Sequence, residues 1–375
     1  MGYKKDCRLF SGYKPCRYKR DCDDCPNYDP PEKRVCVLSL EAMGAVLRST
    51  CLLPAIKRRY PKAHITWITL PQCAALLENN RFIDRLIKLA PATIPAIEFL
   101  KFDVLYSVDK SLEAGALARK INSNQKLGFG ISEDGIIIPL NEEATYQYDV
   151  GLSDELKFYK NTKAETQQLT ETMDLDWQRD EYVLDLTSSE LEESKRRREQ
   201  VVPPSAKGVI GFNTGCSLLF PYKKFTIDRS ISMIAAWREE FPEHAVALLG
   251  GPEDTERQAA MKTHFSDDDY VINTPTTDGL RNGIIWMNIA DTVLSGCSLG
   301  MHIAIALKKH VTAWFGVSCI QEVDLYERGD KLQAEVACSP CWKKSCDEIT
   351  KCFDKVDPRK IVESTRSLLQ DLGKL

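Results

Sequence analysis

Long hydrophobic runs are missing from this chain of 375 residues. Its apolar stretches stay well below the roughly 20 residues that a membrane-spanning helix needs, so we expect no transmembrane segment. Residues 1–8 are polar and lack the apolar core of a signal peptide, which predicts a cytoplasmic protein. A large charge of one sign is missing as well. The net charge of −4 leaves no basic footprint for general nucleic-acid binding.

Cysteine, by contrast, is abundant: there are 14, with one group near each end of the chain. Clustered thiols in a reducing compartment are more often metal ligands or free thiols than disulfides. Each group contains a tight Cys-x-x-Cys pair, which supplies the first two ligands of a tetrahedral Zn²⁺ or iron site. We expect a structural metal at each group, although ligands from both groups could share one site. The candidate ligands are Cys7, Cys16, Cys22 and Cys25 in the first group and Cys338, Cys341, Cys346 and Cys352 in the second.

The length predicts two or three domains, and the periodicity divides the chain into three parts. Residues 1–33 show no helix or strand period, so their order must come from a metal or from docking on the body. Residues 34–205 alternate apolar strands with helices and end in a polar helical extension, which predicts a first Rossmann-like α/β domain. Residues 206–375 repeat the alternation and predict a second such domain. It ends in the second cysteine group and in a helix over 358–372, whose apolar stripe could pack back across the domains.

Three loops of the second domain follow strands and carry small or charged residues. Residues 295–302 turn from a strand into an apolar helix, whose end presents N–H groups and a positive dipole suited to phosphate. Asn213–Ser217 follows another strand, with Lys223 and Lys224 within reach to neutralise a diphosphate. Glu253, in the third loop, could accept a hydrogen bond from a ribose hydroxyl or cap the next helix. Each loop alone is compatible with an ordinary crossover, but three at the strand ends of one sheet favour a nucleotide site.

Three cysteines of the second domain, Cys216, Cys297 and Cys319, also follow strands. Such thiols could hold a metal or a cluster, or could respond to redox conditions. We favour the simpler interpretation that they are small buried residues, because cysteine packs as a compact hydrophobe. Glu322, after the last core strand, could bind sugar hydroxyls or lie in an ordinary surface loop.

The chain resembles glycosyltransferase family 9, the ADP-heptose:lipopolysaccharide heptosyltransferases. The resemblance rests on the first-domain segments 38–48, 54–57, 60–61 and 70–84 and on the second-domain segments 213–225, 248–253 and 295–316. It implies the GT-B architecture, in which two Rossmann-like domains face a cleft, here with a small cysteine-rich N-terminal appendage. It also implies inverting transfer of a sugar, heptose in this family, from a nucleotide-diphosphate donor such as ADP-heptose to a glycan or lipopolysaccharide-core acceptor.

By the same resemblance, the acceptor binds the first domain and the donor binds the second. No Asp-x-Asp pair stands out in a cleft loop, so we expect no Mg²⁺ requirement. We also expect no nucleic-acid partner, and peripheral membrane association remains open. The expected donor-binding residues are Asn213, Thr214, Gly215, Ser217, Lys223, Lys224, Glu253, Ser298, Leu299, Gly300, Met301, His302 and Glu322.

The departures from the family pattern concern two carboxylates. The family's general base is an Asp at the position of Ala45, and a second family Asp is replaced by Cys297. Inverting transfer needs a group that removes the acceptor proton, so Glu41, four residues before Ala45, is our candidate catalytic base. The alternatives are a non-catalytic or redox-regulated nucleotide-sugar-binding protein on the same scaffold, and a protein glycosyltransferase.

Overall fold

The computed structural model describes residues 2–375, which form two α/β units. The first unit comprises Met1–Leu152 and Thr166–Asp185, and the second comprises Ser153–Glu165 and Leu186–Leu375. Residues 186–205 thus belong to the second unit, whereas the sequence analysis placed them at the end of the first domain.

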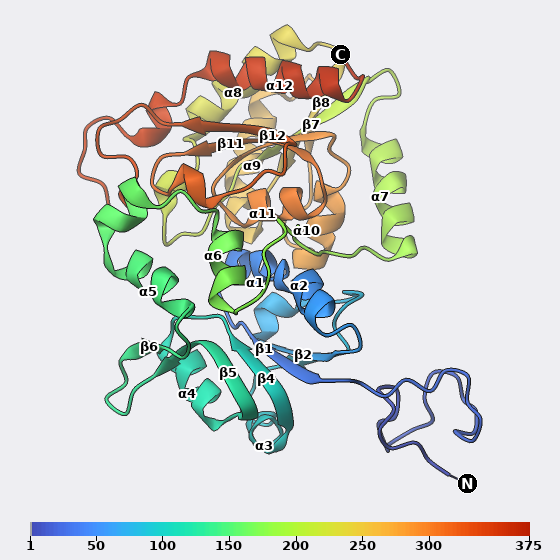
Figure 1. Ribbon diagram of the computed structural model, residues 1–375. Coiled ribbons are helices and arrows are strands. Elements are labelled where there is room, and N and C mark those ends of the chain that lie inside the picture. The colour runs from blue at the N-terminus through green and yellow to red at the C-terminus, as the bar shows by residue number, and fades with distance from the viewer. Residues whose placement is uncertain (1) are drawn as a thin grey trace. The chain divides into compact units, whose positions relative to one another are not determined.

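The first unit is built on a six-stranded sheet with the order β3-β2-β1-β4-β5-β6. Only β6 is antiparallel to its neighbour. Residues 35–38 are fully buried, as expected for a parallel strand that is covered on both faces. Helices α1 and α2 cover one face, and α3 and α4 the other (Figure 1). The strands are β1 (Arg34–Leu38), β2 (His64–Thr69), β3 (Arg85–Lys88), β4 (Lys101–Ser107), β5 (Asn122–Ile131) and β6 (Ile137–Pro139). The helices are α1 (Met43–Ser49), α2 (Leu52–Arg59), α3 (Ile94–Phe99), α4 (Leu112–Lys120), α5 (Ala144–Leu152) and α6 (Glu165–Thr172).

The second unit contains a six-stranded, fully parallel sheet with the order β12-β11-β10-β7-β8-β9. Helices α8 and α12 lie on one side of this sheet, and α10 and α11 on the other (Figure 1). The strands are β7 (Gly208–Asn213), β8 (His244–Leu249), β9 (Val271–Asn273), β10 (Thr292–Gly296), β11 (His310–Phe315) and β12 (Gly329–Gln333). The helices are α7 (Ser188–Val201), α8 (Ile227–Glu240), α9 (Thr255–His264), α10 (Leu280–Met287), α11 (Leu299–Ala306) and α12 (Pro358–Asp371).

Helix α12 covers the sheet of its own unit. Two residues of its apolar stripe, Ile361 and Leu369, belong to the same buried core as residues of β7, β8 and α8, and Val362 packs against that core. Trp237 Nε1 on α8 donates to Thr365 Oγ1 over 3.2 Å. The sequence allowed this stripe to pack back across the domains, whereas Ile361 and Leu369 pack in the core of the second unit.

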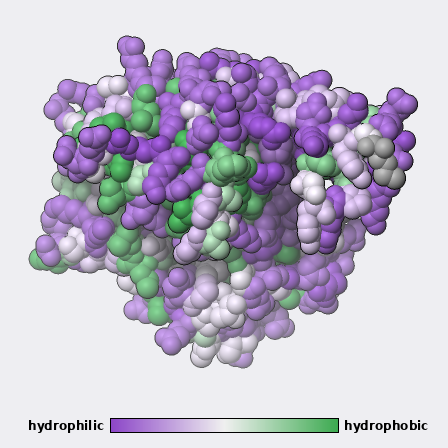
Figure 2. Space-filling model, turned by 90° about the horizontal axis from the view of Figure 1, so that it is seen from below, coloured by the Kyte–Doolittle hydropathy of each residue, from purple (hydrophilic) through white to green (hydrophobic). Residues whose placement is uncertain are grey.

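Apolar side chains do not form a continuous band on the face of the molecule that Figure 2 shows. The face in Figure 2 is largely hydrophilic, with apolar side chains in scattered groups. Within residues 2–375, no helix is both long enough and apolar enough to span a membrane.

Candidate functional site

The candidate donor site lies at the carboxyl edge of the second sheet, where the loops after β7, β8, β10 and β11 meet. Parallel strands end at the same edge, so residues far apart in sequence come together there. The buried side chain of Asn213, the last residue of β7, connects two of these loops, the one after β7 and the one after β10. Its Nδ2 donates to Gly215 O (3.0 Å), Ser295 Oγ (2.9 Å) and Ser298 Oγ (3.0 Å). These hydrogen bonds of Asn213 therefore hold the loops in position relative to one another.

The start of helix α11 packs directly on this amide. Ser298 is the residue before the helix, and a Cβ added to Gly300 would lie only 2.3 Å from Asn213 Oδ1. A side chain at Gly300 would therefore push the first turn of α11 away from β7. Met301 and His302 are buried, while Leu299 and Gly300 are partly exposed. The exposed start of α11 thus carries the unpaired N–H groups and the positive helix end that suit an anion.

A buried carboxylate holds the loops after β7 and β8 together. Asp254 accepts a hydrogen bond from the backbone N–H of Gly251, and its Oδ1 lies 3.4 Å from Lys224 Nζ. Gly215 lies so close to Asp254 that a Cβ there would be 1.8 Å from Oδ2. Thr214 is buried too, and its Oγ1 donates to Leu249 O. Thr214, Gly215 and Lys224, which were predicted to bind the donor, therefore pack the two loops together. The part that Asp254 plays in this packing was not predicted from the sequence.

Lys223 has different surroundings from its neighbour Lys224. Its Nζ lies 4.9 Å from the ring centre of Phe220 and 4.5 Å from that of Trp342, in the second cysteine group. Lys157 Nζ lies 4.3 Å from the same Trp342 ring. The ammonium groups of both lysines thus make cation–π contacts with one indole. These contacts place two positive charges near the carboxyl ends of the strands. Neither Trp342 nor Lys157 was recognised in the sequence.

The remaining predicted donor residues differ in exposure. Glu322 is buried, and its Oε1 lies 3.7 Å from Lys157 Nζ. Glu253 and Ser217 are exposed, and Ser217 Oγ accepts from the N–H of Leu219. The exposed pair can reach a ligand, whereas Glu322 already has an ion-pair partner.

The three strand-end cysteines are not arranged as one group of thiols. Cys297 is near enough to Cys319 to contribute to its raised pKa, which burial brings to about 12. Cys216 donates to Phe220 O, and burial also raises the pKa of its thiol. The two raised pKa values correspond to protonated, packed thiols, which fits the interpretation of small buried residues.

The candidate acceptor loop lies in the first unit, after β1. Glu41 is exposed, and the preceding residues are held by Asp109, which follows β4. Asp109 Oδ1 accepts from Ser39 Oγ (3.2 Å), while Oδ2 accepts from the backbone N–H groups of Leu40 and Glu41. Burial raises the pKa of Asp109 to about 6, despite these hydrogen bonds. Asp109, like Asp254, Trp342 and Lys157, was not selected from the sequence, since a lone Asp after a strand is common.

The predicted metal ligands are only partly assembled. Among residues 2–375, no three His, Cys, Asp or Glu side chains are already placed to hold a metal ion. Cys341 and Cys346 are near enough to Cys352 to contribute to its raised pKa, which burial brings to about 11, while Cys338 is exposed. All 14 cysteines are unpaired by disulfides.

Known structures share this arrangement of two Rossmann-like units, which confirms the predicted GT-B glycosyltransferase fold. A family model for glycosyltransferase family 9 (heptosyltransferase) matches residues 97–352, more than half of the chain. The protein therefore belongs to this family. No curated protein matches the sequence significantly.

The similar solved structures are distant in sequence. A family 9 glycosyltransferase from Veillonella parvula is 16% identical with a TM-score of 0.74, covering 92% of this chain and 99% of its own. The ADP-heptose lipopolysaccharide heptosyltransferase II of Escherichia coli is 14% identical with a TM-score of 0.67, covering 91% and 99%. The iron-containing dodecameric glycosyltransferase TibC of E. coli is 10% identical with a TM-score of 0.54, covering 91% and 77%. At these identities the likeness concerns the fold.

Proposed function

We propose that this protein is an inverting glycosyltransferase that moves a heptose from ADP-heptose to a glycan or lipopolysaccharide-core acceptor in the cytoplasm. The observation that carries the proposal is that Lys223 and the start of α11 both lie at the end of β10: Asn213 binds Ser298 before the helix, and a Cβ at Gly296 would lie 2.1 Å from Lys223 O. A diphosphate needs such a combination of fixed positive charge and unpaired N–H groups.

The proposed transfer is a single displacement at the anomeric carbon. The acceptor hydroxyl oxygen attacks this carbon as its bond to the diphosphate oxygen breaks, and the configuration inverts. The diphosphate leaves with the electron pair of the broken bond, and Lys223 together with the positive end of α11 stabilises its charge. The hydroxyl proton passes to the exposed carboxylate of Glu41.

Asp109 is a positioning residue in this scheme. Its carboxylate accepts hydrogen bonds from the backbone N–H groups of Leu40 and Glu41 and so fixes the loop from which Glu41 projects. Fixing the loop before the acceptor binds removes an entropic cost from the reaction.

The test compares the full chain with Glu41→Gln in an assay for ADP release from ADP-heptose and for the mass of the glycosylated acceptor. Glu41→Gln is expected to abolish transfer and to keep the Kd for ADP, because the amide cannot take the proton. Glu113→Gln, an exposed change on α4, is the control and should behave as wild type. Transfer at the wild-type rate by Glu41→Gln would remove Glu41 from the catalytic role.

A second candidate function is the binding of a nucleotide-sugar without transfer, with or without redox regulation. Ala45 and Cys297 favour it, since both stand where the family has a carboxylate. It requires tight ADP-heptose binding by the wild type with no transfer to any glycan. Transfer of the sugar to a polypeptide instead of a glycan would support the third alternative, that the enzyme glycosylates proteins.

Structural zinc or iron at the C-terminal cysteine group completes the proposal. In the C-terminal group, the proximity of Cys341, Cys346 and Cys352 fits a thiolate site, with Cys338 as the exposed fourth ligand. Such a metal would cross-link the loop that carries Trp342.

A further inference from the structure

The segment of residues 2–33 has no core of its own. It contains no helix or strand, and none of these residues is buried. A piece of chain this small cannot offset the entropy of its own ordering by apolar burial, so a cross-link of another kind is expected.

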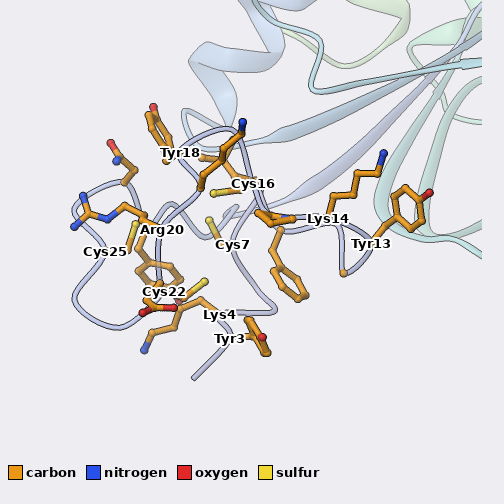
Figure 3. Close-up of a pocket in the computed structure, with 18 residues that line it drawn as sticks. Tyr3, Lys4, Cys7, Tyr13, Lys14, Cys16, Tyr18, Arg20, Cys22 and Cys25 are labelled. Atoms are coloured by element: carbon orange, nitrogen blue, oxygen red, sulfur yellow. The ribbon is translucent and has the colours of Figure 1, made fainter. Parts of the chain in front are cut away.

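The four cysteines of this segment line one open cavity, together with several basic and aromatic side chains (Figure 3). Figure 3 labels Cys7, Cys16, Cys22 and Cys25, which come from different parts of the segment and all line this cavity. The four thiols are the only cysteines among residues 2–33, and all of them face one space.

Each of the four cysteines also begins a tight turn. Its carbonyl accepts a hydrogen bond from the N–H group three residues later, which closes the turn. The four bonds are Phe10 N to Cys7 O (3.0 Å), Lys19 N to Cys16 O (2.9 Å), Cys25 N to Cys22 O (3.4 Å) and Tyr28 N to Cys25 O (3.1 Å). A turn that starts at a ligand brings following N–H groups near its sulfur, where they can support a metal-bound thiolate.

The charge around the cavity suits a thiolate site. Four thiolates and one divalent cation carry a net charge of −2, which needs nearby positive groups in a site of this kind. Lys4, Lys14, Lys19 and Arg20 all line the cavity. They provide that compensation from within the segment.

Arg8 connects the segment to the α/β body of the first unit through its side chain, beside the backbone hydrogen bonds of Glu32 and Lys33 with Lys62 and His64. Arg8, next to Cys7, pairs with Asp29 in the segment (Nε to Oδ2, 2.7 Å) and with Asp84 in the body (Nη1 to Oδ1, 3.3 Å). Its Nη2 donates to Lys62 O over 3.0 Å. A bond between Cys7 and a metal ion would therefore restrain its neighbour Arg8, which helps to hold the segment on the body.

We propose that Cys7, Cys16, Cys22 and Cys25 bind one zinc or ferrous ion as a tetrathiolate, and that this ion folds the segment. The thiols are not yet at ligand positions, and the cavity of about 730 Å³ exceeds the space that one ion occupies. Binding therefore draws the four turns together. The site is independent of sugar transfer, because its ligands all lie in residues 2–33.

The experiment measures metal in the full chain, purified under reducing conditions, by elemental analysis and absorption. Cys22→Ser/Cys25→Ser is compared with wild type, and Cys338→Ser/Cys341→Ser is the matched control for the other cysteine group. The first variant is expected to lose one equivalent that the control retains. Replacement of the metal by Co²⁺ in the control should give thiolate charge-transfer bands and intense tetrahedral d–d bands.

Zinc or iron in the elemental analysis supports the site and identifies the ion, and a ferrous site should gain a visible thiolate charge-transfer band on oxidation to the ferric state. Equal metal content in Cys22→Ser/Cys25→Ser and wild type, or a cobalt spectrum without thiolate bands, overturns it. Because the variant can fail to fold, wild type is also digested with trypsin, with and without a chelator. Cleavage after Arg17, Lys19 and Arg20 should appear only after chelation, and equal cleavage in both samples contradicts the proposal.

Discussion

Lys224 and Asp254 form an ion pair between the loops after β7 and β8, with 3.4 Å between Nζ and Oδ1. The carboxylate is buried, and the lysine side chain is mostly covered. Lys223, its neighbour in sequence, contacts aromatic rings instead. Two adjacent lysines that look equivalent in the sequence therefore have different tasks, one in packing and the other at the proposed diphosphate site.

Lys223→Ala is expected to weaken ADP binding roughly tenfold to a hundredfold, because a charged hydrogen bond contributes about 1.5–3 kcal/mol. Lys224→Ala is expected instead to lower the free energy of unfolding by about 3 kcal/mol, since it leaves Asp254 buried without its ion-pair partner. Calorimetric titration with ADP and urea unfolding measure the two effects. Lys207→Ala, which breaks an exposed pair with Glu243, is the control and should change neither. The reverse distribution of effects would contradict these roles.

Gly300→Ala is expected to destabilise the protein by about 1–3 kcal/mol, because the new methyl group would overlap the amide of Asn213. Gly283→Ala is the matched control. Gly283 also lies in a helix, α10, but its Cβ would meet no atom within 4 Å. Alanine there should raise stability by about 0.5–1 kcal/mol. Thermal or urea unfolding checks both, and equal stabilities of the two variants would show that α11 can shift at no cost.

Trp342→Ala is expected to weaken ADP binding about fivefold to tenfold without a matching loss in kcat. The indole holds Lys223 and Lys157 by cation–π contacts, each worth about 0.5–2 kcal/mol. Trp342→Phe keeps a ring at this position and should recover most of the affinity. An unchanged Kd in Trp342→Ala would mean that Lys223 keeps its position without the indole.

Asp109 makes stability depend on pH. Burial raises its pKa from the ordinary value of 3.8 to about 6, so the folded state binds the proton more tightly than the unfolded state. This contribution is fully present below about pH 4 and is lost as the pH rises to about 6, a change of about 3 kcal/mol. Asp109→Asn cannot titrate there. The difference in unfolding free energy, wild type minus variant, should therefore fall across this range in urea unfolding at several pH values, and parallel curves would contradict it.

Much of the fold could be predicted because the inner strands are short apolar runs. Residues 35–38 and 245–249 are almost completely buried, and such runs bounded by turns indicate parallel strands. Strand β12 was not predicted, since Gly329–Gln333 is polar and lies at the edge of its sheet. Strand β5 was missed for a related reason, because its first half, residues 122–125, carries only polar side chains.

The candidate site could be located from sequence only down to its loops. The loops after β7 and β10 were predicted from their small residues, and both lie at the carboxyl edge of the sheet. Asp109, Asp254 and Trp342 were not predicted, because their roles depend on partners distant in sequence: Asp109 binds residues 39–41 across 68 or more positions. No local pattern distinguishes such a carboxylate from one that is solvated.

The amide of Asn213 has a thermodynamic consequence for the loops that it joins. Because one side chain bonds to Gly215, Ser295 and Ser298, these segments share a single support and cannot relax independently. Substitutions in them should then be non-additive, with coupling energies of about 0.5–3 kcal/mol in double-mutant cycles. The loops at this edge of the second sheet would then respond cooperatively to a ligand, because a ligand that stabilises one loop also stabilises the loops bonded to Asn213.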